Sequence, residues 1–287
     1  MAWLDTIYEY DGSFDGFLCC VYESYINKEF PIAFCGDEEC FSLYPVRCVI
    51  TIPEHARRVL RSLVSISEPA VRLLRRAFLT CMEDRESHLY AFVRKLYAQG
   101  DSFLRDQSDP VYHPLAQAVR HLNGELEKLR GFVRFSDYNG VLGGEIAPKN
   151  RVLPLLRSHF CNRCANESFF LYDRTHRELL LYADGCSRIL PVDQLQLDLP
   201  GQEEVHYRTL WKCFHETIAI RERTNPRCQN TFLPKRYRGT MTEFLPDVYE
   251  TIPPEVPAGA PGSGAPGGIP APGIPPGSGP SAPGSTP

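Results

Sequence analysis

The first fifty residues alternate between strand-like and helix-like spacing of apolar positions. Ile7 to Tyr10 alternate and end at the turn signal Asp11-Gly12-Ser13, after which apolar residues recur at helical spacing from Phe14 to Tyr25. Val46 to Ile52 is rich in β-branched residues and stops before Pro53. The pattern therefore predicts a strand, a turn and a helix, then irregular chain over residues 26–45 and a second strand.

Four amphipathic helices are predicted next, because apolar positions follow one another at intervals of three and four residues. Ser67 is the expected N-cap of the second helix, Gly100 closes the third, and Asp109 opens the fourth. The apolar stripes of these helices cover residues 56–64, 70–81, 89–96 and 115–129. Each helix has one apolar face, so all four must pack against something.

From Gly131 onward the period of the apolar positions changes to two. Strands are expected at residues 132–135, 141–147, 169–172, 178–182 and 187–192, with a helix at 152–160 between them. A last helix runs from about residue 203 to 223, and an extended basic segment continues to Glu243. The expected fold class is α+β: a helical N-terminal half, then a mostly antiparallel sheet with a C-terminal helix.

The composition changes abruptly near Pro253. Residues 253–287 contain 12 prolines and 9 glycines, and Glu255 is their only charge. Such a segment cannot bury enough apolar surface to offset the entropy of ordering it. We predict one domain at residues 1–250, with a helical part over about 1–130 and a sheet part over about 131–250, and a disordered Pro/Gly-rich tail at 251–287.

Several features predict a cytoplasmic protein. No apolar run approaches the roughly 18 residues of a membrane span, and the N-terminal residues lack the basic and apolar regions of a secretory signal. The 11 cysteines are odd in number and scattered through apolar stretches. Without an export signal they are interpreted as reduced thiols and not as a disulfide framework.

Charge is unevenly distributed along a chain whose formal net charge is −4. The window from Glu54 to Arg76 has six arginines against two glutamates, and the window from Arg221 to Arg238 has six basic residues against one glutamate. Two basic segments on a mildly acidic protein are what a polyanion-binding surface would produce. The alternative is a pair of ordinary solvated faces.

No catalytic motif identifies a reaction. The sequence lacks a phosphate-binding glycine loop, a His-Glu-x-x-His pair, a Gly-x-Ser-x-Gly elbow and the cysteine spacing of a radical-SAM cluster. Cys161 and Cys164 have the spacing of two zinc ligands, but a second pair is missing, so a pair of helix-end cysteines is the favoured interpretation. Asp173 to His176 lies between two predicted strands and is interpreted as a turn. Catalytic residues stay unassigned, and no metal or other cofactor is expected.

Three ordered motifs resemble a bacterial DNA-metabolism (DNA-repair) family, a domain of unknown function. They are Tyr8-x-Tyr-Asp-Gly-Ser-Phe14 with Gly16 to Tyr22; Leu129 to Phe135 with Ile146-x-Pro148 and Leu153 to Phe160; and Leu210-Trp211, Ile218-x-Ile220, Asn225-Pro226, Gln229 and Pro234 to Tyr237. The resemblance covers nearly all of residues 7–245. It implies a role beside a DNA-modifying radical-SAM protein, and related versions are fused ahead of uracil-DNA-glycosylase-like domains.

This chain departs from the family pattern at several positions. Glu127 replaces a histidine that usually follows the glutamate matched by Glu125, and Arg238 replaces a tryptophan. The cysteines at 161 and 164 fall where the family generally has none. If the histidine were catalytic in relatives, this chain would be a poor enzyme.

The expected function is that of a DNA-associated accessory or binding protein. Lys and Arg neutralise phosphates without reading sequence, and interleaved aromatic rings can stack on unpaired bases. A DNA-processing enzyme and a protein–protein scaffold remain alternatives, with Glu125, Asp137 and Glu145 as the carboxylates open to an enzyme. The expected partners are DNA and the radical-SAM protein, with no membrane, and the candidate nucleic-acid-binding residues are Arg130, Arg134, Arg223, Arg227, Lys235, Arg236 and Tyr237.

Overall fold

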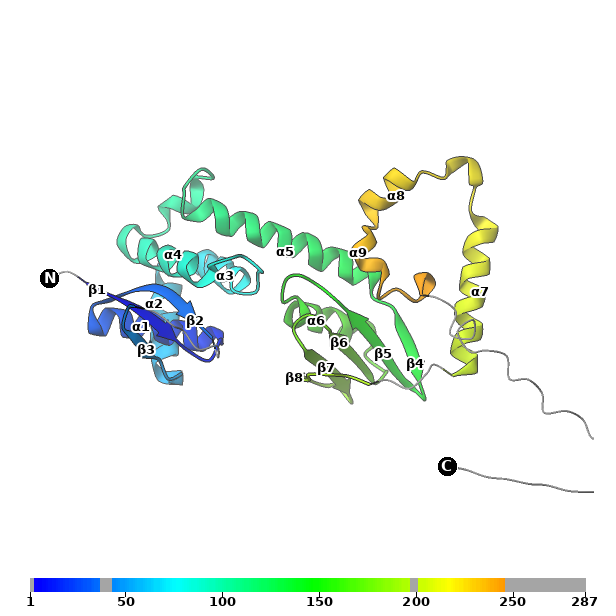
Figure 1. The fold of residues 1–287 in the computed structure, drawn as a ribbon, viewed down its shortest axis with the longest axis horizontal. Coiled ribbons are helices and arrows are strands. Elements are labelled where there is room, and N and C mark those ends of the chain that lie inside the picture. The colour runs from blue at the N-terminus through cyan, green and yellow to red at the C-terminus, as the bar shows by residue number, and fades with distance from the viewer. Residues whose placement is uncertain (1–2, 37–42, 197–200, 246–287) are drawn as a thin grey trace, which may run out of the picture. The chain divides into compact units, whose positions relative to one another are not determined.

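The computed structural model describes residues 3–36, 43–196 and 201–245 (Figure 1). Contacts divide the chain into two units, Met1–Asp247, which contains all the described residues, and Val248–Pro287, which lies outside them. The predicted Pro/Gly-rich tail lies outside the described residues. Everything below concerns the first unit.

A three-stranded parallel sheet begins the chain. Its strands are β1 (Leu4–Glu9), β2 (Glu29–Cys35) and β3 (Val46–Cys48), in the order β2-β1-β3. Helix α1 (Phe14–Asn27) connects β1 to β2, and the Ser13 hydroxyl caps it by accepting a hydrogen bond from the Gly16 amide. The prediction of irregular chain over residues 26–45 is wrong for Glu29–Cys35, which form β2. Pro31 weakens the sequence signal for a strand, but an edge strand tolerates proline because one row of its amides is not needed for pairing.

The predicted helices follow as α2 (Pro53–Ile66), α3 (Glu68–Ala77), α4 (Arg85–Gln99) and α5 (Tyr112–Phe132), with a short 3₁₀ helix η1 (Ser102–Arg105) before α5. Ser67 caps α3, as predicted, by accepting from the Ala70 amide. Gly100 ends α4 with a φ of 67°, a conformation that favours glycine. Asp109 accepts from the amides of Val111 and Tyr112, so it caps α5 from just outside the helix.

The second sheet has five strands in the order β4-β5-β6-β7-β8. They are β4 (Phe135–Tyr138), β5 (Val141–Ile146), β6 (Phe169–Asp173), β7 (Glu178–Ala183) and β8 (Cys186–Pro191). Only β5 and β6 are parallel, and helix α6 (Leu153–Arg163) connects them. The α+β fold with a mostly antiparallel sheet is therefore confirmed.

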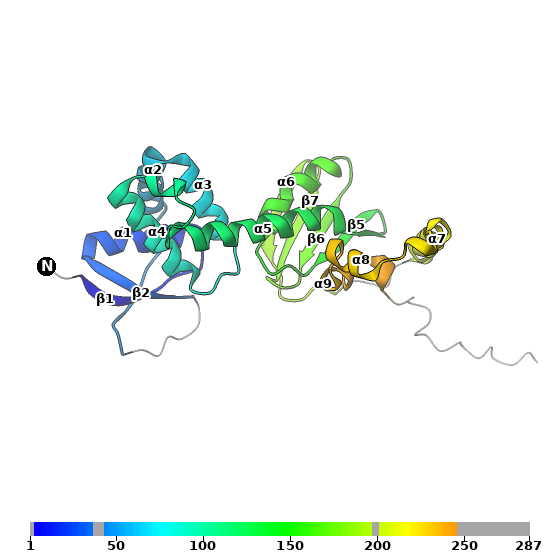
Figure 2. The same cartoon turned by 90° about the horizontal axis from the view of Figure 1, so that it is seen from above.

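Helix α5 contributes to two apolar cores. Its N-terminal half places Leu115 and Val119 in the core formed with α1 to α4. Its C-terminal half places Leu122, Leu126 and Leu129 against α6 and the five-stranded sheet (Figure 2). One long helix thus joins the helical part of the chain to the sheet part.

The C-terminal segment is helical where an extended chain was predicted. After α7 (Gln202–Ile218) come the 3₁₀ turn η2 (Arg221–Arg223), α8 (Pro226–Phe232), α9 (Lys235–Arg238) and the 3₁₀ turn η3 (Thr242–Phe244). The Asn225 side chain accepts from the Cys228 amide at 3.0 Å, and Pro226 occupies the first turn of α8. These local start signals favour a helix even though the segment lacks an apolar stripe.

The prediction that all cysteines are reduced thiols is wrong for Cys35. Cys35 is disulfide-bonded, whereas the other nine cysteines of the described part are free. A disulfide depends on how two cysteines are placed in space, which their spacing in the sequence does not fix. None of the described helices is long and apolar enough to cross a membrane.

Two glycines give opposite expectations for substitution by alanine. A Cβ on Gly143 in β5 would lie 2.3 Å from the Phe170 ring, so Gly143→Ala should lower the free energy of unfolding by about 1–3 kcal/mol. A Cβ on Gly124 in α5 would meet nothing within 4 Å, so Gly124→Ala should raise it by roughly 0.5–1 kcal/mol. Urea denaturation of both variants measures the difference, and equal effects would contradict this packing.

Candidate nucleic-acid interface

A buried carboxylate on α5 binds α9, the short helix that carries three of the predicted binding residues. Glu125 is 3% exposed. Its Oε2 accepts hydrogen bonds from the Asn150 amide at 2.9 Å and the Asn150 side-chain Nδ2 at 2.7 Å, and its Oε1 accepts from the Lys149 amide at 3.1 Å. The Asn150 side-chain oxygen in turn accepts from the Cys81 amide at 3.0 Å. Glu125 therefore fixes the loop between β5 and α6 against α5.

The same carboxylate holds α9. Arg236 Nη2 lies 3.2 Å from Glu125 Oε1, and it also donates to the Tyr237 hydroxyl. The Tyr237 ring is 3% exposed and packs 5.4 Å from Phe132, and burial raises the pKa of its hydroxyl. This ring is part of the core, so it is not available to stack on a base as the sequence had suggested.

Glu125 binds the Arg236 side chain and the Lys149 amide, and Lys235 precedes Arg236 in the chain; we call Lys149, Lys235 and Arg236 the α9 cluster. Arg236 is half-exposed and paired with Glu125. Lys149 and Lys235 are exposed and form no ion pair within the described residues. Sequence reasoning missed Lys149 and Asn150. The available signal was their position, since they directly follow the Ile146-x-Pro148 motif between a strand and a helix.

The remaining predicted cations of this segment are exposed on η2 and α8. Arg223 and Arg227 both face solvent without an ion pair among the described side chains. Phe232, at the end of α8, is 73% exposed and is the aromatic residue here with an accessible ring. Arg238, by contrast, donates to Asn230 and to the Leu233 carbonyl, so part of its bonding capacity is used internally.

Arg130 and Arg134 are committed to interactions within the protein. Arg134 forms a double interaction with Glu243, with Nη2 2.8 Å from Oε1 and Nε 3.2 Å from Oε2, and it also donates to the Gly131 carbonyl. Arg130 pairs with Glu127 at 2.7 Å. Of the two, Arg134 is the more constrained, because it ties the end of α5 to η3.

Removing either partner of the Arg134–Glu243 pair should affect stability more than ligand binding. We expect Arg134→Gln and Glu243→Gln each to lower the free energy of unfolding by about 1–2 kcal/mol. The double variant should lose about as much stability as either single variant, because both substitutions remove the same interaction. Affinity of the Arg134→Gln variant for DNA should stay within about twofold, because Arg134 is bound to Glu243 and is not free to bind a phosphate. A chemical-denaturation cycle measures the coupling, and strictly additive effects would contradict the pairing.

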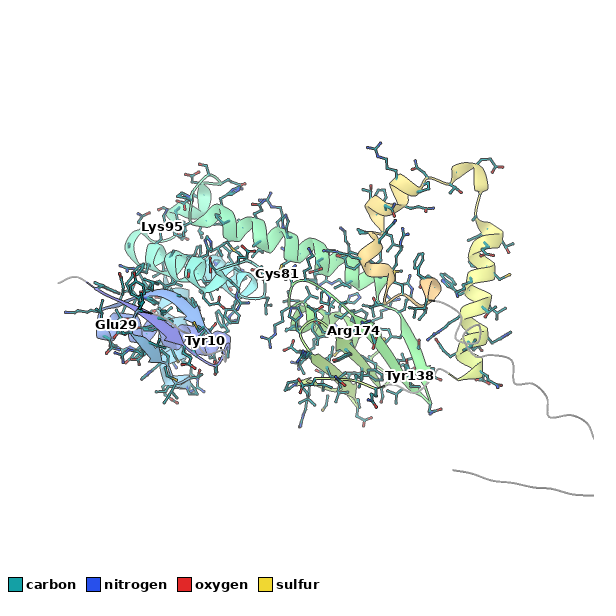
Figure 3. The ribbon with its side chains drawn as sticks, viewed as in Figure 1. Tyr10, Glu29, Cys81, Lys95, Tyr138 and Arg174 are labelled. Carbon is teal, nitrogen blue, oxygen red and sulfur yellow. The ribbon has the colours of Figure 1, made fainter. Side chains whose placement is uncertain are left out.

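The other carboxylates considered for catalysis do not converge with Glu125. Asp137 is exposed and accepts from the Gly140 amide in the turn after β4. Glu145 lies 3.8 Å from Arg174, which follows β6 (Figure 3). Asp173 is fully buried and accepts from the Thr175 and His176 amides, which confirms the predicted turn.

The cysteine pair is at a helix end, as predicted. Cys161 lies in the last turns of α6, Cys164 is its C-cap, and both pack on the sheet core as free thiols. Among the described residues, no group of three or more His, Cys, Asp or Glu is placed to hold a metal ion.

The first basic window forms a second cationic surface, on α2 and α3. Arg57 and Arg72 pair with glutamates one helical turn away, and Arg76 donates to Asn123. Arg58, Arg61 and Arg75 are exposed, and the described residues supply no carboxylate to them. This surface belongs to the helical part of the chain, before α5.

The family model described as "Domain of unknown function (DUF4130)" matches residues 83–243, more than half of the 287-residue chain. The chain belongs to the DUF4130 family. The matched region runs from the start of α4 to η3 and contains Glu125, the α9 cluster and the five-stranded sheet. The first of the three motifs, Tyr8 to Tyr22, lies outside it. No curated protein matches the sequence.

Proposed function

We propose that this DUF4130 protein is a DNA-associated accessory or binding protein in DNA repair or modification. The observation that carries the proposal is a set of exposed cations in the C-terminal segment, Arg223, Arg227 and Lys235, that have no acidic partner among the described residues. Unpaired cations on helix ends and turns are the groups that bind phosphates irrespective of base sequence. Lys149 is a further exposed cation, and its backbone amide is bound to Glu125.

The buried carboxylate supports the proposal through pre-organisation. Glu125 positions Arg236 and the amide of Lys149 at one oxygen, so the neighbouring cations are presented on a fixed framework. A fixed cation loses less conformational freedom when a phosphate binds than one on a mobile arm. The exposed ring of Phe232 adds a surface for one unpaired base.

The test is fluorescence anisotropy of the full chain with a labelled single-stranded oligonucleotide and a duplex of the same sequence. Saturable binding with no change in either DNA after prolonged incubation supports an accessory protein. Binding followed by base loss or strand cleavage, resolved on a denaturing gel, would instead indicate a DNA-processing enzyme. Failure to bind either DNA at low salt would remove the proposal.

The resemblance to the DNA-metabolism family adds a radical-SAM protein as the proposed partner. A second candidate function, a scaffold for that protein, is favoured by α7, whose Tyr207, Leu210, Trp211, Phe214 and Ile218 recur at helical spacing and are all at least half exposed. Exposed apolar faces of this kind mark protein interaction surfaces. Co-purification from the native host should retain the radical-SAM protein after nuclease treatment if the scaffold function holds, and Trp211→Ser with Phe214→Ser should release it.

A further inference from the structure

A pocket of about 380 Å³ lies in the helical part of the chain, away from the α9 cluster. Its lining residues lie on α1, α2 and α4. Helix α2 packs against both of the other helices (Figure 2). Its walls are Val21, Tyr22, Tyr25, Ile26, Arg58, Val59, Ser62 and Tyr97. The volume is within the range of small-molecule sites, and all of these residues except Tyr97 precede the DUF4130 match.

Three tyrosine rings give the pocket its shape. Tyr25 and Tyr97 meet edge to face, with ring centroids 5.6 Å apart. Tyr22 is held on one side by the His55 ring, which stacks on it at 4.0 Å. Burial raises the pKa of Tyr25 and of Tyr97, which disfavours the charged form of both hydroxyls. A wall of fixed aromatic rings favours a flat aromatic ligand over a flexible chain.

The polar groups of the pocket have defined roles. The Ser62 hydroxyl donates its single hydrogen to the Val59 carbonyl at 2.7 Å. In the 2.5 Å interaction between Ser62 and Tyr97, Tyr97 must therefore be the donor. The Tyr97 oxygen is left as an acceptor at the pocket wall. It suits a ligand that carries an N–H group on its ring.

The pocket also contains one cation and no carboxylate. Arg58 is exposed, its guanidinium carbon lies 5.9 Å from the Tyr22 ring centroid, and it forms no ion pair with any described residue. The nearest arginine on the same helix, Arg57, is by contrast paired with Glu54. A free guanidinium beside an aromatic pocket is suited to a phosphate on the ligand.

We propose that this pocket binds a nucleotide, with the base among the tyrosines and its phosphate on Arg58. The tyrosine wall, the Tyr97 acceptor and the Arg58 cation fit one ligand, because a nucleotide contains a flat ring, N–H donors and an anion in one molecule. The pocket contains neither the α9 cluster nor Arg223 and Arg227, so the proposal does not depend on the function proposed above. The nucleotide could be free or could be the end of a DNA strand, since both carry the same groups.

The test is isothermal titration calorimetry of the full chain with adenosine 5′-monophosphate, adenosine and ribose 5-phosphate. We expect the monophosphate to bind more tightly than either fragment. Arg58→Gln should weaken the monophosphate about tenfold and leave adenosine unchanged, because the substitution removes only the interaction with the phosphate. Tyr25→Ala, at a half-exposed rim position, should weaken both ligands by about tenfold.

Arg61→Gln is the matched control, since Arg61 is an exposed, unpaired arginine of the same helix that does not line the pocket. Its affinity for the monophosphate should equal that of the parent chain. No binding of the monophosphate, or equal losses from Arg58→Gln and Arg61→Gln, would overturn the proposal. A competition experiment distinguishes a free nucleotide from the end of a DNA strand. A 5′-phosphorylated oligonucleotide is added to the monophosphate complex of the variant in which Arg223, Arg227 and Lys235 are replaced by Gln. Displacement of the monophosphate indicates that the pocket binds a strand end, and continued binding of the monophosphate indicates a free nucleotide.

Discussion

Glu125→Ala should be among the most destabilising single substitutions in the chain. The carboxylate is buried and accepts from two backbone amides and one side-chain amide while it faces Arg236. Alanine would leave these donors without a partner, and each buried unsatisfied group costs about 1–3 kcal/mol. We expect the free energy of unfolding, measured by urea denaturation, to fall by about 3 kcal/mol or more.

Glu127→Ala provides the control on the same helix. Glu127 is exposed and pairs with Arg130 at the surface, so its removal should cost less than about 1 kcal/mol. Comparable losses from the two variants would show that Glu125 does not organise the loop and α9 as described.

Replacing Arg223, Arg227 and Lys235 by Gln should weaken DNA binding strongly without unfolding the protein. All three are exposed and make no ion pair with described residues, so their removal leaves no buried charge unpaired. If each neutralises one phosphate of single-stranded DNA, each contributes about fivefold to affinity at 0.1 M salt through counterion release, and together they account for about 100-fold. Arg236 stays in place because it is bound to Glu125. Fluorescence anisotropy measures the loss.

A control with the same change in charge uses Arg174, Arg177 and Arg188, which are exposed on turns and strands of the five-stranded sheet. Replacing these three by Gln should reduce the affinity for DNA much less than the C-terminal substitutions do, because only the net charge of the protein changes. Equal losses from the two triple variants would mean that DNA responds to overall charge and not to the C-terminal segment.

The elements that the sequence predicted well carry their own local signals. Helix α3 has an apolar stripe, an N-cap at Ser67 and arginines on the opposite face, all of which agree. The five strands of the second sheet lie where short apolar segments predicted them, and turns separate them except between β5 and β6, where α6 forms the connection. Tertiary contacts do not need to override local preference in either case.

Two elements were missed because their own sequence signals are weak. Strand β2 contains Pro31 and becomes recognisable only by its pairing with β1. Helix α8 has caps but no apolar stripe, so hydrophobic periodicity could not reveal it.

In the candidate site, too, the sequence predicted local properties but not tertiary contacts. The sequence identified Arg223, Arg227 and Lys235 from local charge density, and the structure places all three in solvent. It could not show that Arg134 is paired with a glutamate 109 positions away, or that Tyr237 is buried under Phe132. Charge and aromatic content are local properties, whereas their pairing and burial are set by the tertiary fold.

Salt dependence of DNA binding tests the central claim most directly. Anisotropy titrations of the parent chain and the Arg223/Arg227/Lys235 variant with a single-stranded oligonucleotide should be repeated over a series of salt concentrations. We predict that the logarithm of the parent's association constant falls linearly with the logarithm of salt concentration, and that the variant's slope is shallower by about 2, near 0.7 for each phosphate that the variant no longer neutralises. Equal slopes for parent and variant, or no binding by the parent at the lowest salt, would contradict a phosphate-binding role for this segment.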